Sequence, residues 1–144
     1  MSLAVSFKRF DQDVPAPEYA TEDAAALDLS ARLTVTIKPR QIGYVPLNIA
    51  LQLPQGYWAL LAARSSLHKR GVMMANGIGV GDYDFRGDSD EYQAALLNFT
   101  DQPVIIERGD RIVQLLVLSR EPVELHEADA FDSENRGGFG STGK

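Results

Sequence analysis

The chain has 144 residues, of which 44% are hydrophobic, and it carries 14 lysines and arginines, 20 aspartates and glutamates and no cysteine. This length fits one domain with its own core, and the lack of cysteine excludes disulfides, thiolate metal sites and a cysteine nucleophile. The net charge of −6 argues against a general nucleic-acid binder, because basic surfaces hold phosphate backbones. Any phosphate site is therefore expected to be local.

The longest apolar run, from Ile112 to Leu118, is interrupted by Gln114 and is too short to cross a bilayer. The N-terminal residues show no secretory signal. We therefore expect a soluble, cytoplasmic protein that has neither a membrane nor a nucleic acid as its partner.

Short stretches of alternating or β-branched apolar residues dominate the chain, and Pro, Gly, Asp or Asn bounds each of them. They predict strands at Val5–Phe10, Leu33–Ile37, Ile42–Leu53, Tyr57–Ala63, Tyr92–Asn98, Val104–Glu107, Ile112–Leu118 and Val123–His126. Only Ser65–Arg70 is typical of a short helix, with Ser65 or Ser66 as its cap. The spacing indicates an all-β sandwich, barrel or jelly roll.

Polar residues interrupt two of the apolar segments. Asp28 lies among small and apolar residues, so its carboxylate needs either an arginine partner or a role in a ligand site. Arg64, Ser65 and Ser66 lie where a strand turns into the helix start. Backbone amides, two hydroxyls and a guanidinium at one point suit an anion, although the same residues also fit an ordinary N-cap.

Two later segments combine glycine or turn residues with polar side chains. Between residues 76 and 87, alternate glycines would let a ligand lie against bare backbone, and Asp82 and Asp84 would share one face of an extended segment. The alternative is an ordinary Gly/Asp-rich hairpin. Farther on, Gln114 lies inside an apolar strand, where its amide must be hydrogen-bonded.

From Asp132 to the terminus, Phe139 is the only large apolar residue, and glycine occupies positions 137, 138, 140 and 143. Such a tail cannot fold alone, which fits a disordered terminus. It also fits a lid that closes over a nucleotide. In that reading Phe139 stacks on the base, while Ser141 and Thr142 offer hydroxyls to phosphate oxygens.

In order and roughly in spacing, these five clusters resemble the five motifs of the trimeric dUTPase (deoxyuridine triphosphate nucleotidohydrolase) family, from Ala24 to Lys144. The resemblance implies a jelly-roll homotrimer with shared active sites at the subunit interfaces, which hydrolyses dUTP to dUMP and pyrophosphate with Mg²⁺. This reaction keeps uracil out of DNA and supplies dUMP for thymidylate synthesis. The resemblance also implies a β jelly-roll core over residues 1–131 and a flexible Gly-rich arm over residues 132–144, which closes the active site.

The same resemblance implies roles for individual residues. Asp82 would orient and deprotonate the water that attacks the α-phosphorus. Asp28 would contact Mg²⁺ through water, the metal being held mainly by the substrate phosphates, and Arg111 is its candidate partner. The implied phosphate contacts are Arg64, Ser65, Ser66, Gln114, Arg136, Ser141 and Thr142, and the implied uracil and deoxyribose contacts are Asn76, Gly79, Asp82, Phe85 and Phe139.

The chain departs from the family pattern in three places. Phe85 stands where the family usually has a tyrosine, so the ring that excludes ribose stays but its hydroxyl is absent. The usual arginine of the last motif falls at Glu134, while Arg136 lies nearer to Phe139. The segment from Gly87 to Asn98 holds an acidic insertion, Asp88 to Glu91, for which we expect a solvated loop.

Two other functions fit parts of the sequence. A dCTP deaminase shares the fold and an Arg-Ser-Ser segment, but it requires a glutamate near the end of the strand after the hairpin, where this chain has Ala95. A jelly-roll module that binds nucleotides without catalysis would not need Asp82. Both sequence features favour the hydrolase.

Overall fold

The computed structural model describes residues 2–140 and residue 143. Its strands are β1 (Ser6–Arg9), β2 (Glu18–Tyr19), β3 (Leu27–Ser30), β4 (Val35–Ile37), β5 (Ile42–Pro46), β6 (Ile49–Gln52), β7 (Tyr57–Ala63), β8 (Val72–Met74), β9 (Gly79–Gly81), β10 (Gln93–Asn98), β11 (Val104–Ile106) and β12 (Arg111–Ser119). The 3-10 helix η1 (Leu67–Arg70) follows β7. The described part of the chain contains no helix long and apolar enough to cross a membrane.

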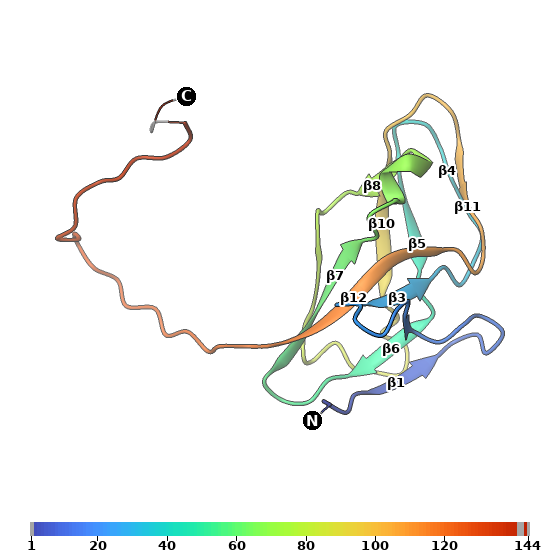
Figure 1. Cartoon of the computed structure of the whole chain (residues 1–144), viewed down its shortest axis with the longest axis horizontal. Coiled ribbons are helices and arrows are strands. Elements are labelled where there is room, and N and C mark those ends of the chain that lie inside the picture. Colours follow the sequence, from blue (N-terminus) through green and yellow to red (C-terminus); the bar gives the residue numbers. More distant parts are fainter. Residues whose placement is uncertain (1, 141–142, 144) are drawn as a thin grey trace.

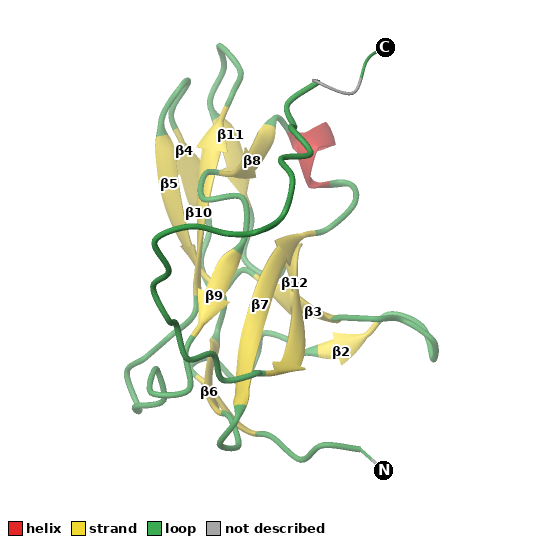
Figure 2. Ribbon diagram, turned by 90° about the vertical axis from the view of Figure 1, so that its left-hand side faces the viewer, coloured by secondary structure: helices red, strands yellow, loops and turns green. Residues whose placement is uncertain are grey.

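The strands form a sandwich of antiparallel sheets. The largest sheet has the order β2-β3-β12-β7-β9, and smaller sheets pair β5-β10-β8, β1-β6 and β11-β4. Figure 2 shows β7, β9, β12 and β3 on one side of the molecule and β4, β5, β8, β10 and β11 on the other. After β12 the chain leaves this body and runs away from it as a long tail (Figure 1).

The core lies between these strand groups, because alternate side chains point inward. Along β10, Ala94, Leu96 and Asn98 are buried, while the residues between them are more exposed. Asn98 is fully buried, and its amide donates to the carbonyls of Ile37 and Gln102 at 2.9 and 2.7 Å. The largest fully buried apolar side chains are Val14, Leu29, Ile37, Val45, Leu47, Ile49, Leu53, Val72, Leu96, Ile106, Ile112 and Val113.

The predicted strand Ile42–Leu53 is wrong as a single element, because it divides into β5 and β6 at Asn48. Asn48 has a positive φ of 68°, a conformation that asparagine tolerates better than most residues. Its side chain accepts from the Asp11 amide at 2.7 Å and donates to the Asp11 carbonyl at 2.9 Å. These bonds fix the bend at which β5 ends.

Other local predictions need correction. The predicted strand Val123–His126 is not formed in the single chain, and the predicted helix is the shorter 3-10 helix η1. Ser66 occupies its N-cap but makes no side-chain capping hydrogen bond, whereas Gly71 ends it with φ of 85°. The sequence reading also missed the short strands β2, β3, β8 and β9, which have too few residues to show a period.

Candidate active site

Asp28 lies at the centre of a polar cluster on the large sheet. Gln114 of β12 pairs in register with Asp28 of β3 on one side and with Ala62 of β7 on the other. Arg64 directly follows β7, so three neighbouring strands bring these side chains together. Asp28, Arg64, Ser65 and Gln114 line one small hollow, and we call these four residues the Asp28 cluster.

Two arginines, Arg64 and Arg111, pair with Asp28. Nε of Arg64 lies 3.0 Å from Oδ1 of Asp28, and Nη1 of Arg111 lies 3.6 Å from Oδ2. Oδ2 is buried and has no hydrogen-bond partner within the described part of the chain. Asp28 therefore combines two arginine contacts with one carboxylate oxygen that can still accept a hydrogen bond.

Two more of the predicted phosphate contacts, Gln114 and Ser65, lie close to this carboxylate. Gln114 donates from its amide to the Ala63 carbonyl at 3.0 Å, as expected for a polar group within a core strand. An amide carries two N–H bonds, so the second can donate to an anion. Ser65 shares the hollow with Asp28, while Ser66 is its exposed neighbour on the same turn.

A second, larger hollow of about 540 Å³ lies beside β9. Four of the predicted side chains or backbone positions line it, namely Asn76, Gly79, Asp82 and Phe85, together with Tyr44, Leu61, Val80, Gly81, Glu91, Tyr92, Gln93 and Ala95. We call it the β9 hollow. It shares no residue with the Asp28 cluster.

Strand β9 contributes Gly79, Val80 and Gly81 to the lining of this hollow. It is the last strand of its sheet and pairs on one side only, with β7. An edge strand leaves one row of amide and carbonyl groups unpaired. These groups have the fixed donor and acceptor pattern that can read the edge of a planar base.

The glycines of this hairpin have distinct structural causes. Gly77 has φ of 73° in the turn before β9, which glycine adopts without strain. A Cβ on Gly81 would approach Cε1 and Cζ of Tyr92 to 2.7 and 2.9 Å. Gly81 is therefore required by the tyrosine behind the hairpin, a reason that the sequence pattern did not reveal.

Asp82 lies at the rim of the β9 hollow, immediately after β9, and it is exposed. The expectation that Asp82 and Asp84 share one face of an extended segment is wrong. The chain turns at this point, since the Phe85 amide donates to the Asp82 carbonyl at 3.2 Å. The turn leaves Asp82 as the one of these two carboxylates that lines the hollow.

Tyr92 lines this hollow but was not predicted as a site residue. It continues the alternating pattern of β10 and therefore looks like an ordinary core residue. It is 4% exposed, and its ring meets Phe85 edge to face with centroids 5.3 Å apart. Burial, and then the negative charge of Asp82, raise the pKa of Tyr92 to about 12. Its hydroxyl has no hydrogen-bond partner among the residues that the structure describes.

Comparison with known proteins shows the family of this chain. The sequence model of the dUTPase family matches residues 12–143. The deoxyuridine 5'-triphosphate nucleotidohydrolase of Desulfitobacterium hafniense is 40% identical over 99% of this chain and 97% of its own length. The chain belongs to the dUTPase family. The family predicted from the five motifs is thereby confirmed.

Solved dUTPase structures share the fold. The crystal structure of the Streptococcus mutans dUTPase has a TM-score of 0.74 and 28% identity, and the match covers 82% of this chain and 98% of that chain. The Staphylococcus bacteriophage 80alpha dUTPase with dUPNHPP has a TM-score of 0.85 over 99% and 100% of the two chains, at 21% identity. The predicted all-β, jelly-roll class is confirmed.

Among the described residues of the predicted arm, none lines either hollow. Phe139 is fully exposed, and Arg136 lies on the same exposed stretch. Figure 1 shows this part of the tail far from the strands. The predicted contacts Ser141 and Thr142 lie outside the described residues.

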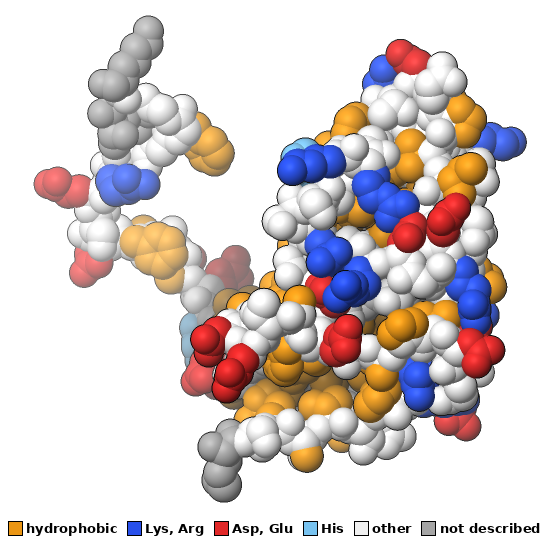
Figure 3. All heavy atoms as spheres, turned by 45° about the vertical axis from the view of Figure 1, so that its right-hand side comes forward, with side chains coloured by type: hydrophobic (Ala, Val, Ile, Leu, Met, Phe, Trp, Pro, Cys, Tyr) orange, Lys and Arg blue, Asp and Glu red, His pale blue; other side chains and the backbone are white. Residues whose placement is uncertain are grey.

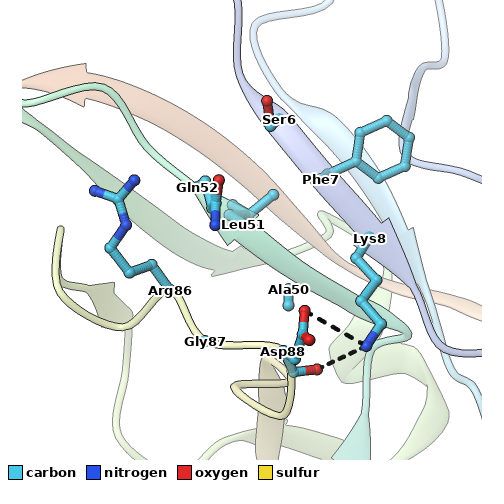
Figure 4. A pocket seen from close by; sticks show the side chains of 9 residues that line it. All are labelled: Ser6, Phe7, Lys8, Ala50, Leu51, Gln52, Arg86, Gly87 and Asp88. Carbon is cyan, nitrogen blue, oxygen red and sulfur yellow. Dashed lines mark hydrogen bonds and ion pairs between the residues drawn. The ribbon is translucent and has the colours of Figure 1, made fainter.

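The acidic insertion is an exposed loop at Asp88, as expected, and it is held to the body at both ends. Glu91 accepts from Nε and Nη2 of Arg32 at 2.6 and 2.9 Å and from the backbone amide of Asn48 at 3.0 Å. At the other end, Lys8 donates to the Asp88 carbonyl at 3.0 Å and lies 3.8 Å from its carboxylate (Figure 4). The insertion therefore bridges β1, Arg32 and the turn at Asn48.

Proposed function

We propose that this chain hydrolyses dUTP to dUMP and pyrophosphate, by attack of water on the α-phosphorus. The observation that supports this most directly is the β9 hollow, where an edge strand and an aromatic ring lie beside a rim carboxylate. This activity would remove dUTP before uracil enters DNA and would supply dUMP for thymidylate synthesis.

Uracil would be read by the free edge of β9 and by Asn76, with Phe85 packing on deoxyribose and Gly79 allowing close approach. A fixed row of backbone donors and acceptors must be fully paired by the bound base. A base whose edge has the wrong pattern leaves buried groups unpaired, which discriminates strongly. This accounts for selection of uracil over cytosine.

Asp82 would act as the general base. Its carboxylate accepts a proton from the water as the oxygen of that water bonds to the α-phosphorus. The bond from this phosphorus to the bridging oxygen then breaks, and pyrophosphate leaves with the electron pair. A positioned carboxylate typically contributes about 10²–10⁴-fold to such a reaction.

Asp28 would sit behind the phosphates, at the water shell of Mg²⁺. The fit rests on Oδ2 of Asp28, which is buried and lacks a hydrogen-bond partner, so it can accept from a metal-bound water. Mg²⁺, when bound to the phosphates, withdraws charge from the reacting phosphorus. Among the residues that the structure describes, no three His, Cys, Asp or Glu side chains gather as a metal-binding group. The ion would therefore be held mainly by substrate oxygens.

The positive side chains would neutralise the triphosphate. Arg64 lies in the Asp28 cluster with Ser65 and Gln114, and Figure 3 shows Lys and Arg side chains gathering on one face of the core. Guanidinium and hydroxyl donors bind phosphate oxygens well. Arg136, Ser141 and Thr142 would add contacts when the arm closes, with Phe139 on the base.

The working assembly would be a cytoplasmic homotrimer with shared sites. The β9 hollow and the Asp28 cluster have no residue in common, which favours a site completed by another chain. The tail also exposes Val123, Leu125 and Phe131, whose exposed fractions are 74%, 90% and 88%. Such apolar side chains favour packing on a neighbouring chain.

The exchange of Asp82 for asparagine tests this function. We expect Asp82→Asn to bind a non-hydrolysable dUTP analogue while turnover falls by about 10²–10⁴-fold. Asp84→Asn is the matched control, since Asp84 is near in sequence but does not line the β9 hollow. Turnover is measured as pyrophosphate release from dUTP, dCTP, dTTP and UTP, with and without Mg²⁺. Wild-type turnover by Asp82→Asn, or oxygen-18 from water appearing in pyrophosphate rather than dUMP, would refute the mechanism.

A further inference from the structure

The hydroxyl of Tyr92 is a buried hydrogen-bond donor with no acceptor. The oxygen is shielded from solvent and has no hydrogen-bond partner in the structure. A buried tyrosine hydroxyl usually finds a partner, because leaving it unpaired destabilises the folded state. The unpaired hydroxyl of Tyr92 therefore lowers the stability of the fold. Its position next to the β9 hairpin suggests a role in the site.

The hydroxyl lies directly beneath the β9 hairpin. A Cβ on Gly81 would overlap the phenol ring of Tyr92, so the glycine allows the hairpin to rest on the tyrosine. Asp82 is the next residue along the chain. The Tyr92 ring also contacts Phe85 edge to face, with the two ring planes at 76°.

Asp82 is the available acceptor among the titratable groups of this hollow. Tyr44, Asp82 and Glu91 are the titratable side chains that line it besides Tyr92. Glu91 is already engaged by Arg32 and by the Asn48 amide. Tyr44 is 67% exposed and can exchange its hydrogen bonds with water. The charge of Asp82 acts on Tyr92, which keeps its proton because its pKa is raised to about 12.

We propose that Tyr92 is a positioning residue, whose hydroxyl donates a hydrogen bond to the Asp82 carboxylate when a nucleotide fills the β9 hollow. The inference rests on the proposed role of Asp82 as general base. The bond would hold one carboxylate oxygen against the hairpin and leave the other facing the attacking water. Tyr92 itself does not touch the reacting atoms.

The exchange Tyr92→Phe removes the hydroxyl and keeps the ring. We expect kcat for dUTP to fall about tenfold, the loss of one hydrogen bond to a charged group, while KM changes by less than about twofold. The melting temperature should stay equal or rise, since an unpaired buried hydroxyl has been removed. A hydroxyl with only a structural role would leave kcat unchanged, and that result would overturn the inference.

Two further variants decide through which group Tyr92 acts. Tyr57→Phe, on β7 but outside the hollow, is the control and should keep wild-type kcat. In an Asp82→Asn background, single-turnover rates should fall by less than about twofold when Tyr92→Phe is added. A further tenfold loss in the double variant would mean that Tyr92 does not act through Asp82. If Asp82→Asn alone is fully active, the proposed function fails, whatever Tyr92→Phe does.

Discussion

Tyr92, which lines the β9 hollow, makes the stability of the fold depend on pH. Burial and the charge of Asp82 raise its pKa in the folded protein from 10.0 to about 12. In the unfolded chain the phenol ionises first as the pH rises. The free energy of unfolding is therefore unaffected by Tyr92 below a pH of about 10 and falls between about 10 and 12.

This dependence can be measured with Tyr92→Phe. Relative to the variant, the wild-type protein should lose about 1 kcal/mol of unfolding free energy when the pH is raised from about 8 to about 11. Urea unfolding at both pH values gives the quantity, and comparison of the two proteins cancels the contributions of the other tyrosines and lysines. An identical pH dependence in wild type and variant would show that the Tyr92 pKa is not raised.

At the scale of single residues, sequence reasoning found those whose chemistry is visible in their type. Asp28 and Gln114 were predicted because a polar group within an apolar segment needs a partner, and both have one. Tyr92 was missed because an aromatic at an inward position of a strand looks like ordinary core. Only the absence of a hydroxyl partner, which a sequence does not show, distinguishes it.

At the scale of elements, the loop from Gly87 to Glu91 is held by a clamp at each end. Hydrogen bonds to Glu91 raise the pKa of the Arg32 guanidinium, although its burial opposes this. The Glu91 carboxylate also caps the Asn48 amide. The hydrogen bonds of Glu91 therefore join the edge of the β9 hollow to the bend between β5 and β6.

Removal of this carboxylate should destabilise the fold. We expect Glu91→Ala to lower the free energy of unfolding by about 2–3 kcal/mol, since Arg32 and a backbone amide lose their acceptor. Asp101→Ala is the control, because it breaks a comparable but exposed pair with Arg40 and should cost no more than about 1 kcal/mol. Urea denaturation of both variants checks the comparison. Equal losses would show that burial adds nothing to the Glu91 clamp.

Which elements could be predicted depended on whether the signal was local. The period of β7 fixed its bounds at Tyr57–Ala63, the range found. The break within Ile42–Leu53 depends on hydrogen bonds between Asn48 and Asp11, which is far away in sequence. The alternation at Val123–His126 is genuine, but a strand needs a neighbour, and in the single chain this segment has none among the described residues.

At the scale of the whole molecule, the exposed tail and the separate hollows support shared sites. Asp82→Asn chains and chains that lack residues 136–144 should each be nearly inactive. After unfolding and refolding together they should regain part of the wild-type turnover, because some sites then combine an intact Asp82 with an intact arm. Two preparations that both carry Asp82→Asn serve as the control. No recovery after confirmed subunit exchange, or a monomer by light scattering, would contradict the arrangement.

The arm can be followed by fluorescence. Trp58 is the only native tryptophan, so Phe139→Trp in a Trp58→Phe background places one reporter on the arm. Its emission should change when a non-hydrolysable dUTP analogue and Mg²⁺ bind, because the indole then leaves solvent and stacks on the base. Such a base–aromatic stack is worth about 1–3 kcal/mol. Deletion of residues 136–144 should reduce turnover far more than stability. Unchanged emission together with unchanged turnover in the deletion would mean that the arm takes no part.

If the β9 hollow of one chain acts with the Asp28 cluster of another, as proposed above, catalysis is a property of the assembly and not of the single chain. A folded chain on its own would carry both halves of a site but would be unable to use them on one substrate. Dilution below the dissociation constant of the assembly would then silence the protein without unfolding it, and mass action would restore it. The concentration of the chain in the cell thus becomes a determinant of turnover per molecule.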